Sequence, residues 1–80
     1  MSAEYNYINA DVFAFRLRTA MFMRRIKIGK LAENVGRTEA AVICWRYGRQ
    51  IPNVDVLVAI ADTLNVSLDY LTGRKESMEI

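Results

Sequence analysis

Residues 30–45 read KLAENVGRTEAAVICW, and this stretch decides the fold. Its apolar residues fall at helical spacing in two groups, first Leu31, Ala32 and Val35 and then Val42 and Trp45. Gly36 lies between the groups, where the chain must turn, and glycine adopts a positive φ without steric cost. Thr38 is placed to cap the second helix by accepting a hydrogen bond from a backbone N–H of its first turn. The stretch therefore predicts two short helices joined by a tight turn, which together form a helix-turn-helix unit.

The chain before Gly48 is expected to hold three helices in all. Asp11 is the predicted N-cap of the first, which should run to about Arg25. The residues of this helix that face the core are predicted to be Phe13, Leu17, Ala20 and Met21. The two helices of the unit should occupy residues 28–35 and residues 39 to about 47, and Gly48 lies just past the end.

Two further helices are predicted after Pro52. Asn53 is expected to cap the first of these, which should end at Asn65, with a buried face of Leu57, Val58, Ile60, Ala61 and Leu64. Ser67 should cap a short last helix over residues 68–71. The expected fold is therefore all-α with five helices. Its domain should span residues 11–73, between an N-terminal arm (residues 1–10) and a polar C-terminal tail (residues 74–80) that we expect to fray.

The first predicted helix also carries a second apolar line, formed by Val12, Phe15 and Phe22. A helix that packs on one side only does not need this line, and an exposed pair of phenylalanines would favour aggregation. Either the N-terminal arm or a second subunit is expected to cover it.

Composition excludes several classes of function. The 80 residues suffice for one domain and contain one cysteine and no histidine. An internal disulfide is therefore impossible, and a metal site or a histidine-based catalytic pair is not expected. We expect no cofactor, no small-molecule substrate and no enzymatic activity, because no nucleophile–base pair or paired-carboxylate site stands out. No apolar run reaches the roughly 18 residues of a membrane span, and the single thiol fits the cytoplasm.

Charge is concentrated in one part of the chain. Residues 16–49 carry a net charge of +7, whereas residues 50–80 carry −3 and residues 1–15 carry −2. A polyanion is the expected partner for such a segment, although a solvated basic surface would give the same pattern.

Residues 13–73 resemble the phage repressor and Cro type of helix-turn-helix domain, the xenobiotic response element family. The resemblance rests on an ordered set of residues, which comprises Leu31-Ala32-Glu33, Val35-Gly36, Trp45, Gly48, Pro52, Leu57, Ile60-Ala61 and Leu64 to Gly73. It implies a lambda-repressor-like domain that binds a double-stranded DNA operator as a homodimer and controls transcription. The small size favours a phage or prophage origin.

Residues at the start of a recognition helix meet base edges in the major groove. The candidates here are Glu39, Ala40, Ile43 and Cys44. Glu39 can accept a hydrogen bond from the cytosine amine, and the apolar residues can pack on a thymine methyl group. Each also has a simpler interpretation, since an acid is favoured at any helix N-terminus and small apolar residues suit a helix. A redox role for Cys44 is the weaker alternative to an apolar contact, and we interpret Trp45 as a core anchor.

Phosphate contacts are expected from flanking basic and polar side chains, which supply most non-specific affinity. The candidates are Lys27, Lys30, Arg37, Thr38, Arg46, Arg49 and Gln50. Relatives often have a phosphate-binding glutamine where this chain has Ile28. Many also pair an arginine with a glutamate at the positions of Met21 and Arg46. We therefore predict that Arg46 is free to turn outward to the surface while Met21 fills apolar space.

Two other functions compete with a transcriptional regulator. An antitoxin that represses its own operon would use the same chemistry, but the tail is short for binding a toxin. A protein-interaction module that has lost DNA reading would explain the apolar residues Ala40, Ala41 and Ile43 and the second apolar line. The charge distribution argues against it, because such a module has no need for a segment of charge +7.

Overall fold

The computed structural model describes residues 8–80 and consists of five helices there, with no strand among them. The helices are α1 (Ala10–Arg24), α2 (Ile28–Val35), α3 (Glu39–Arg46), α4 (Val54–Leu64) and α5 (Leu68–Leu71). The predicted all-α class is confirmed. Of the predicted arm, residues 1–7 lie outside the described part of the chain, and Ile8 packs against the core.

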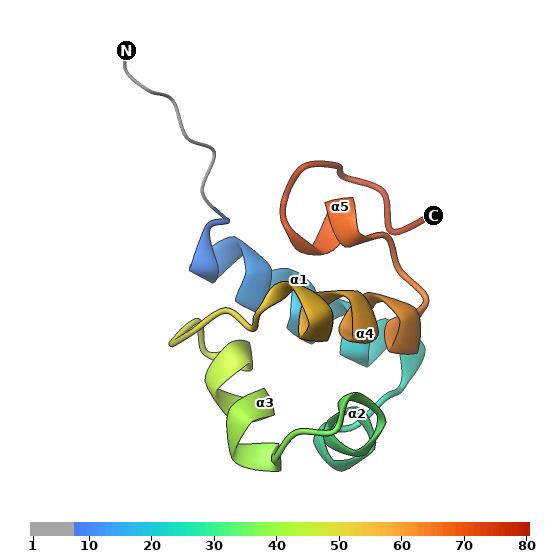
Figure 1. Cartoon of the computed structure of the whole chain (residues 1–80). Helices are drawn as coiled ribbons and strands as arrows, with labels where there is room; N and C mark the ends of the chain where they lie inside the picture. Colours follow the sequence, from blue (N-terminus) through green and yellow to red (C-terminus); the bar gives the residue numbers. More distant parts are fainter. Residues whose placement is uncertain (1–7) are drawn as a thin grey trace.

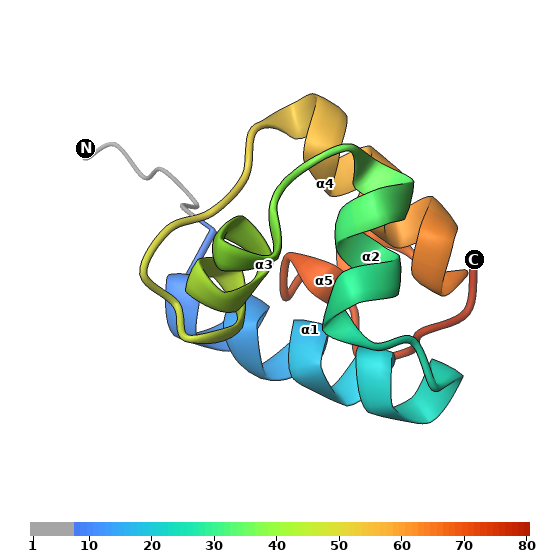
Figure 2. The same ribbon diagram turned by 90° about the horizontal axis from the view of Figure 1, so that it is seen from below.

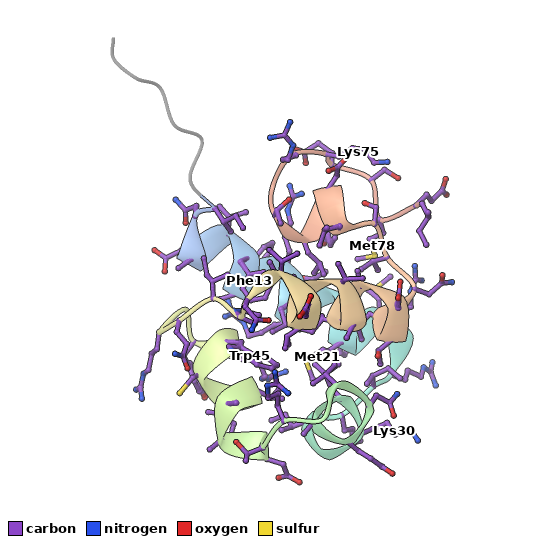
Figure 3. The ribbon with its side chains drawn as sticks, viewed as in Figure 1. Phe13, Met21, Lys30, Trp45, Lys75 and Met78 are labelled. Carbon is purple, nitrogen blue, oxygen red and sulfur yellow. The ribbon has the colours of Figure 1, made fainter. Side chains whose placement is uncertain are left out.

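Helix α1 is the element around which the others pack. It contacts α3, α4 and α5, whereas α2 packs against α3 and α4. Figure 1 shows α2 and α3 on one side of α1 and α5 on the other. The core between them includes the predicted residues of α1, α2 and α3, and Figure 3 shows Phe13, Met21 and Trp45 among the side chains of the interior.

The start of α1 differs from the prediction. Asn9, and not Asp11, is the N-cap, because its Oδ1 accepts hydrogen bonds from the backbone N–H groups of Asp11 (2.9 Å) and Val12 (3.1 Å). Asp11 lies instead within the first turn, where the helix dipole favours an acid.

The turn between α2 and α3 follows the prediction. Gly36 adopts φ +69°, and its N–H and that of Arg37 bond to carbonyls at the end of α2. The Thr38 Oγ1 accepts a hydrogen bond of 3.1 Å from the Ala41 N–H and so caps α3. Helix α3 ends at Arg46, one residue before the predicted boundary.

Helices α4 and α5 begin at the predicted caps, Asn53 and Ser67. Asn65 closes α4 at φ +55°, as expected. The prediction that Val58 is buried is wrong, because this side chain is 42% exposed. Val56 is buried in its place, one turn before Ile60, so that the inner face of α4 is set by its packing and not by apolarity alone.

The C-terminal residues 74–80 fold back onto the domain, contrary to the expected fraying. The Ser67 N–H donates a 2.8 Å hydrogen bond to the Met78 carbonyl, and the Met78 side chain packs against the core. Arg16 donates to the Lys75 carbonyl and forms an ion pair of 3.2 Å with Glu76. The apolar Met78 therefore anchors a segment whose composition is otherwise polar.

Three arginines of α1 each bind the carbonyl end of a different helix. Arg16 donates to the Tyr70 carbonyl in α5 (2.9 Å), Arg18 to the Arg46 carbonyl in α3, and Arg24 to the Leu64 carbonyl in α4 (2.9 Å). The last carbonyls of a helix have no partner within it, and a cation there also complements the helix dipole. Helix α1 thus ties the other helices together by hydrogen bonds as well as by packing.

Candidate nucleic-acid interface

The orientation of α3 follows from its two buried anchors. Val42 is 0% and Trp45 is 3% exposed, so the interpretation of Trp45 as a core residue is confirmed. The opposite side of the helix is therefore at the surface. Ala40 and Ile43 are exposed there, whereas Cys44 is half-buried. The structure brings the predicted reading residues together on one face, with Cys44 at its edge.

Glu39 lies at the side of this face that is next to α2. Its carboxylate Oε2 is 3.0 Å from the position that a Cβ on Gly29 would take, so the acid of α3 lies against the first turn of α2. Lys27, the N-cap of α2, makes no capping hydrogen bond with its side chain. A carboxylate is favoured beside such free helix N–H groups, which also suit a phosphate oxygen.

Most of the predicted phosphate-contacting residues are exposed, and they lie at the start of α2, before α3 and after α3. The exposed members are Lys27, Lys30, Arg37, Thr38, Arg49 and Gln50. Thr38 uses its hydroxyl oxygen as the cap, and Arg37 bonds to the neighbouring Gly36 carbonyl at 3.1 Å. Ile28 is half-buried against the core. The segment from α2 to the residues after α3 therefore carries several exposed basic side chains.

Arg46 does not turn outward as predicted. It is half-buried, and its Nη1 lies 3.5 Å from the Met21 Sδ, while its carbonyl accepts from Arg18. Met21 is buried, as expected. The Arg46 guanidinium thus donates a weak hydrogen bond to the Met21 thioether, and this contact holds it against the buried Met21 instead of at the surface.

Two basic side chains of the segment of charge +7 do not face the surface around α3. Arg16 and Arg24 belong to the segment of charge +7, but both are bonded to helix ends on the α4–α5 side. They are part of the scaffold and do not face the surface around α3. Seven basic residues of this segment remain, against Glu33 and Glu39.

Two features of this surface were missed in the sequence. Tyr47 is 67% exposed, and the Arg49 guanidinium lies 5.9 Å from its ring centre. Tyr47 follows Ile43 by four residues, so helical periodicity could have identified it. The second feature is a basic hollow between α1, α2 and α3, lined among others by Arg18, Arg25, Lys27 and Arg46 above Met21. It forms only in three dimensions, because its residues come from three helices.

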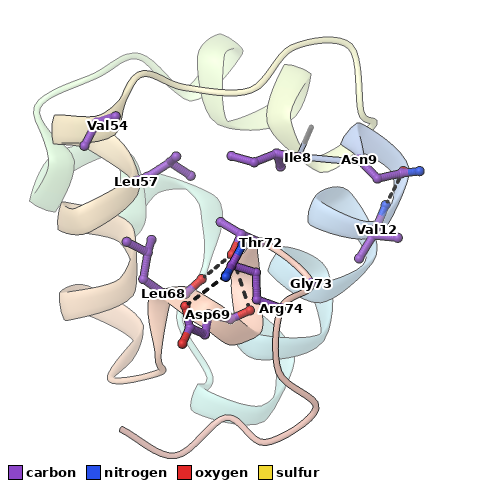
Figure 4. A pocket seen from close by; sticks show the side chains of 10 residues that line it. All are labelled: Ile8, Asn9, Val12, Val54, Leu57, Leu68, Asp69, Thr72, Gly73 and Arg74. Atoms are coloured by element: carbon purple, nitrogen blue, oxygen red, sulfur yellow. Dashed lines mark hydrogen bonds and ion pairs between the residues drawn. The ribbon is translucent and has the colours of Figure 1, made fainter. Parts of the chain in front are cut away.

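A groove between α1, α4 and α5 lies away from this surface (Figure 4). Its charged residues, Asp69 and Arg74, pair with each other at 3.9 Å. Much of the remaining lining is apolar and includes Val12, Val54 and Leu68. The groove thus offers no free charge to an anionic ligand.

Within residues 8–80 no three acidic or cysteine side chains come together as metal ligands would. None of the helices in this range has the length and apolarity needed to cross a membrane. Comparisons of the chain with protein-family models, with curated proteins and with solved structures find no match.

Proposed function

We propose that this chain is a sequence-specific, double-stranded DNA-binding transcriptional regulator of the phage repressor and Cro type. In this proposal its five helices have the lambda-repressor-like arrangement, with α2 and α3 as the helix-turn-helix. The observation that carries the proposal is the outward face of α3, which has the exposed Arg37 before it and Arg49 after it, while α2 beside it carries the exposed Lys27 and Lys30 at and near its start.

In the proposed complex α3 enters the major groove. Ala40 and Ile43 meet base edges, and thymine methyl groups are the contacts that suit them. Glu39 reaches a cytosine amine by leaving its position beside Gly29, which its exposure permits. Specificity thus comes from a mainly apolar face with one acid at its edge.

Phosphates on either side of the groove would be bound by the surrounding cations. Lys27 and Lys30 serve one strand from the start of α2, together with the free N–H groups of that helix. Arg37, Arg49 and Gln50 serve the backbone from the two ends of α3. Arg46 is packed against Met21, so its side chain is not free to bind a phosphate. It instead adds to the positive electrostatic potential of the basic hollow.

A salt titration of binding to random-sequence duplex DNA tests the proposal. We expect the logarithm of the affinity to fall with the logarithm of salt concentration at a slope of about −4, since each neutralised phosphate adds about 0.9. Lys75→Ala, which removes an exposed lysine on the α5 side, serves as the matched control for Lys30→Ala. Undetectable binding at low salt, or binding that salt does not weaken, would contradict the proposal.

Selection of bound sequences from a random duplex library then separates a regulator from a non-specific cationic protein. We expect an operator with two-fold symmetry, because the proposed regulator acts as a homodimer. There are two candidate dimer contacts. One is α5 with the loop before it, and the other is the second apolar line of α1.

A further inference from the structure

The outward side of α1 carries an apolar stripe, which consists of Phe15 and Phe22. Their exposed fractions are 59% and 81%. A spacing of seven residues places them on one face, opposite the buried Phe13, Leu17 and Ala20. Val12 belongs to the groove of Figure 4, because its Cγ1 lies 3.1 Å from the position of a Cβ on Gly73. An exposed stripe with two phenylalanines marks an interaction surface.

The two flanks of the stripe face different parts of the molecule. On one flank Arg18 bonds to the end of α3, and the Asp11 Oδ1 lies 3.1 Å from the position of a Cβ on Gly48, just after α3. On the other flank Arg16 bonds to the Tyr70 carbonyl of α5. Figure 1 shows α1 between the α2–α3 side and the α5 side of the domain, so the stripe lies on a helix that both sides flank.

We infer that this stripe binds the same stripe of a second copy of the chain, with the two α1 helices antiparallel. In this pairing Phe15 packs against Phe22 of the second copy, and Phe22 against its Phe15. Asp11, near the start of α1, then lies close to Arg25 of the second copy, at the end of its α1. A parallel pairing would instead bring Asp11 to Asp11 and Arg25 to Arg25, which like charges disfavour.

Antiparallel pairing also gives the dimer the symmetry that the proposed function needs. Figure 2 looks onto α2 and α3 and shows α1 along the lower edge of the domain. A half-turn in the plane of the page, about a point below α1, places a second copy with its α1 antiparallel to the first. Both α2–α3 pairs then face the same side, as binding to two half-sites of one duplex requires. A parallel pairing would place them on opposite sides.

The rival dimer surface is the groove of Figure 4, where Val54 is 69% exposed. Its charged pair, Asp69 and Arg74, is already satisfied within one copy. The stripe of α1, in contrast, leaves opposite charges at its two ends for a second copy to match. This charge complementarity favours the stripe.

Sedimentation equilibrium of the protein without DNA tests the inference. Phe15→Glu should weaken dimerisation by about tenfold or more, since it places a charge in an apolar contact. Val54→Glu makes the same change of charge at an exposed valine of the rival surface and should leave the dimer intact. Circular dichroism checks that both variants fold. A wild-type protein that stays monomeric up to about 1 mM, or a dimer that Val54→Glu disrupts and Phe15→Glu does not, would overturn the inference.

Disulfide trapping tests the direction of the pairing. In a Cys44→Ser background, Phe15→Cys and Phe22→Cys proteins of different mass are mixed and oxidised. The antiparallel pairing predicts that the mixed disulfide exceeds both same-position disulfides, because only that pair brings the two Cα atoms within about 7 Å. A predominance of same-position disulfides, or the absence of any disulfide, would contradict it.

The inference rests on the proposed function only in the role that it gives the dimer, which is to bind two half-sites of DNA. The pairing of α1 and the binding of DNA can therefore fail separately. A monomeric Phe15→Glu protein should still bind random duplex DNA with the salt dependence of Val54→Glu, which carries the same charge. A dimer that binds no DNA would contradict the proposed function alone. A monomer that binds DNA would contradict the pairing of α1 alone.

Discussion

The α2–α3 half and the α4–α5 half of this domain differ in how many of their basic side chains the protein itself binds. In the α4–α5 half, Arg24 and Arg16 are bonded to the carbonyl ends of α4 and α5. In the α2–α3 half, Arg18 bonds to the end of α3, but Lys27 and Lys30 are exposed and make no side-chain hydrogen bond or ion pair with residues 8–80. Basic residues therefore hold the scaffold in both halves, and only the α2–α3 half has two exposed lysines in addition.

The largest effect should follow from Arg16→Met. The Arg16 side chain is 13% exposed, bonds to the Tyr70 and Lys75 carbonyls, and lies 4.6 Å from the centre of the Tyr70 ring. Because the substitution removes the charge-assisted hydrogen bonds to both carbonyls, we expect a loss of about 2–3 kcal/mol in the free energy of unfolding. Urea denaturation measures this loss. Under conditions where the variant is folded, its DNA affinity should be unchanged. A loss of affinity without a loss of stability would contradict the scaffold role of Arg16.

A smaller loss of stability is expected for Arg24→Met. Arg24 is exposed, so its hydrogen bonds to the Leu64 and Asn65 carbonyls compete with water, and we expect a loss of about 1 kcal/mol. Arg74→Met is the control, because its ion pair with Asp69 is exposed on both sides and should contribute less than about 0.5 kcal/mol. Equal losses of stability for the two variants would show that the Arg24 hydrogen bonds stabilise the domain no more than the exposed ion pair does.

Arg49→Ala should act on binding and not on stability. Its exposed guanidinium contacts only the Tyr47 ring, so we expect a change in the free energy of unfolding below about 0.5 kcal/mol. The salt slope of DNA binding should become shallower by about one, equally for all sequences. A slope that does not change would show that Arg49 touches no phosphate.

The smallest change in affinity is expected for Glu39→Gln. It should change base preference at one position of each half-site, and affinity for random duplex DNA should rise slightly because an acid near phosphates is removed. Glu33→Gln removes an exposed acid of α2 and should raise non-specific affinity without changing preference. If both variants keep the original preference, Glu39 is only a helix-end acid beside Gly29.

The parts of the fold that could be predicted depend on neighbours in the sequence. The caps Thr38, Asn53 and Ser67 bond to backbone groups three residues away, and Gly36 and Asn65 supply positive φ where they stand. Residue type and spacing therefore suffice to place these ends. The cap of α1 was misplaced because Asn9 and Asp11 are both suitable cap residues.

The parts that could not be predicted depend on partners far along the chain. Long arginine side chains can reach many groups, and nothing near Arg16 or Arg24 in sequence indicates a carbonyl more than 35 residues away. The position of Arg46 over Met21 and the folding back of Met78 are set in the same way by packing. The exposed face of α3 was predictable because its buried anchors, Val42 and Trp45, were predictable.

The three arginines of α1 bear on how the domain opens. Each bonds to the carbonyl end of a different helix, so detaching α1 would break these three contacts together with the burial of Phe13, Leu17 and Ala20. Because these bonds and a large part of the core are lost in the same step, we expect α1 to detach only when the whole domain unfolds. The slowest-exchanging amide protons of the molecule should accordingly lie in α1, and the domain should behave as one cooperative unit in spite of its short helices.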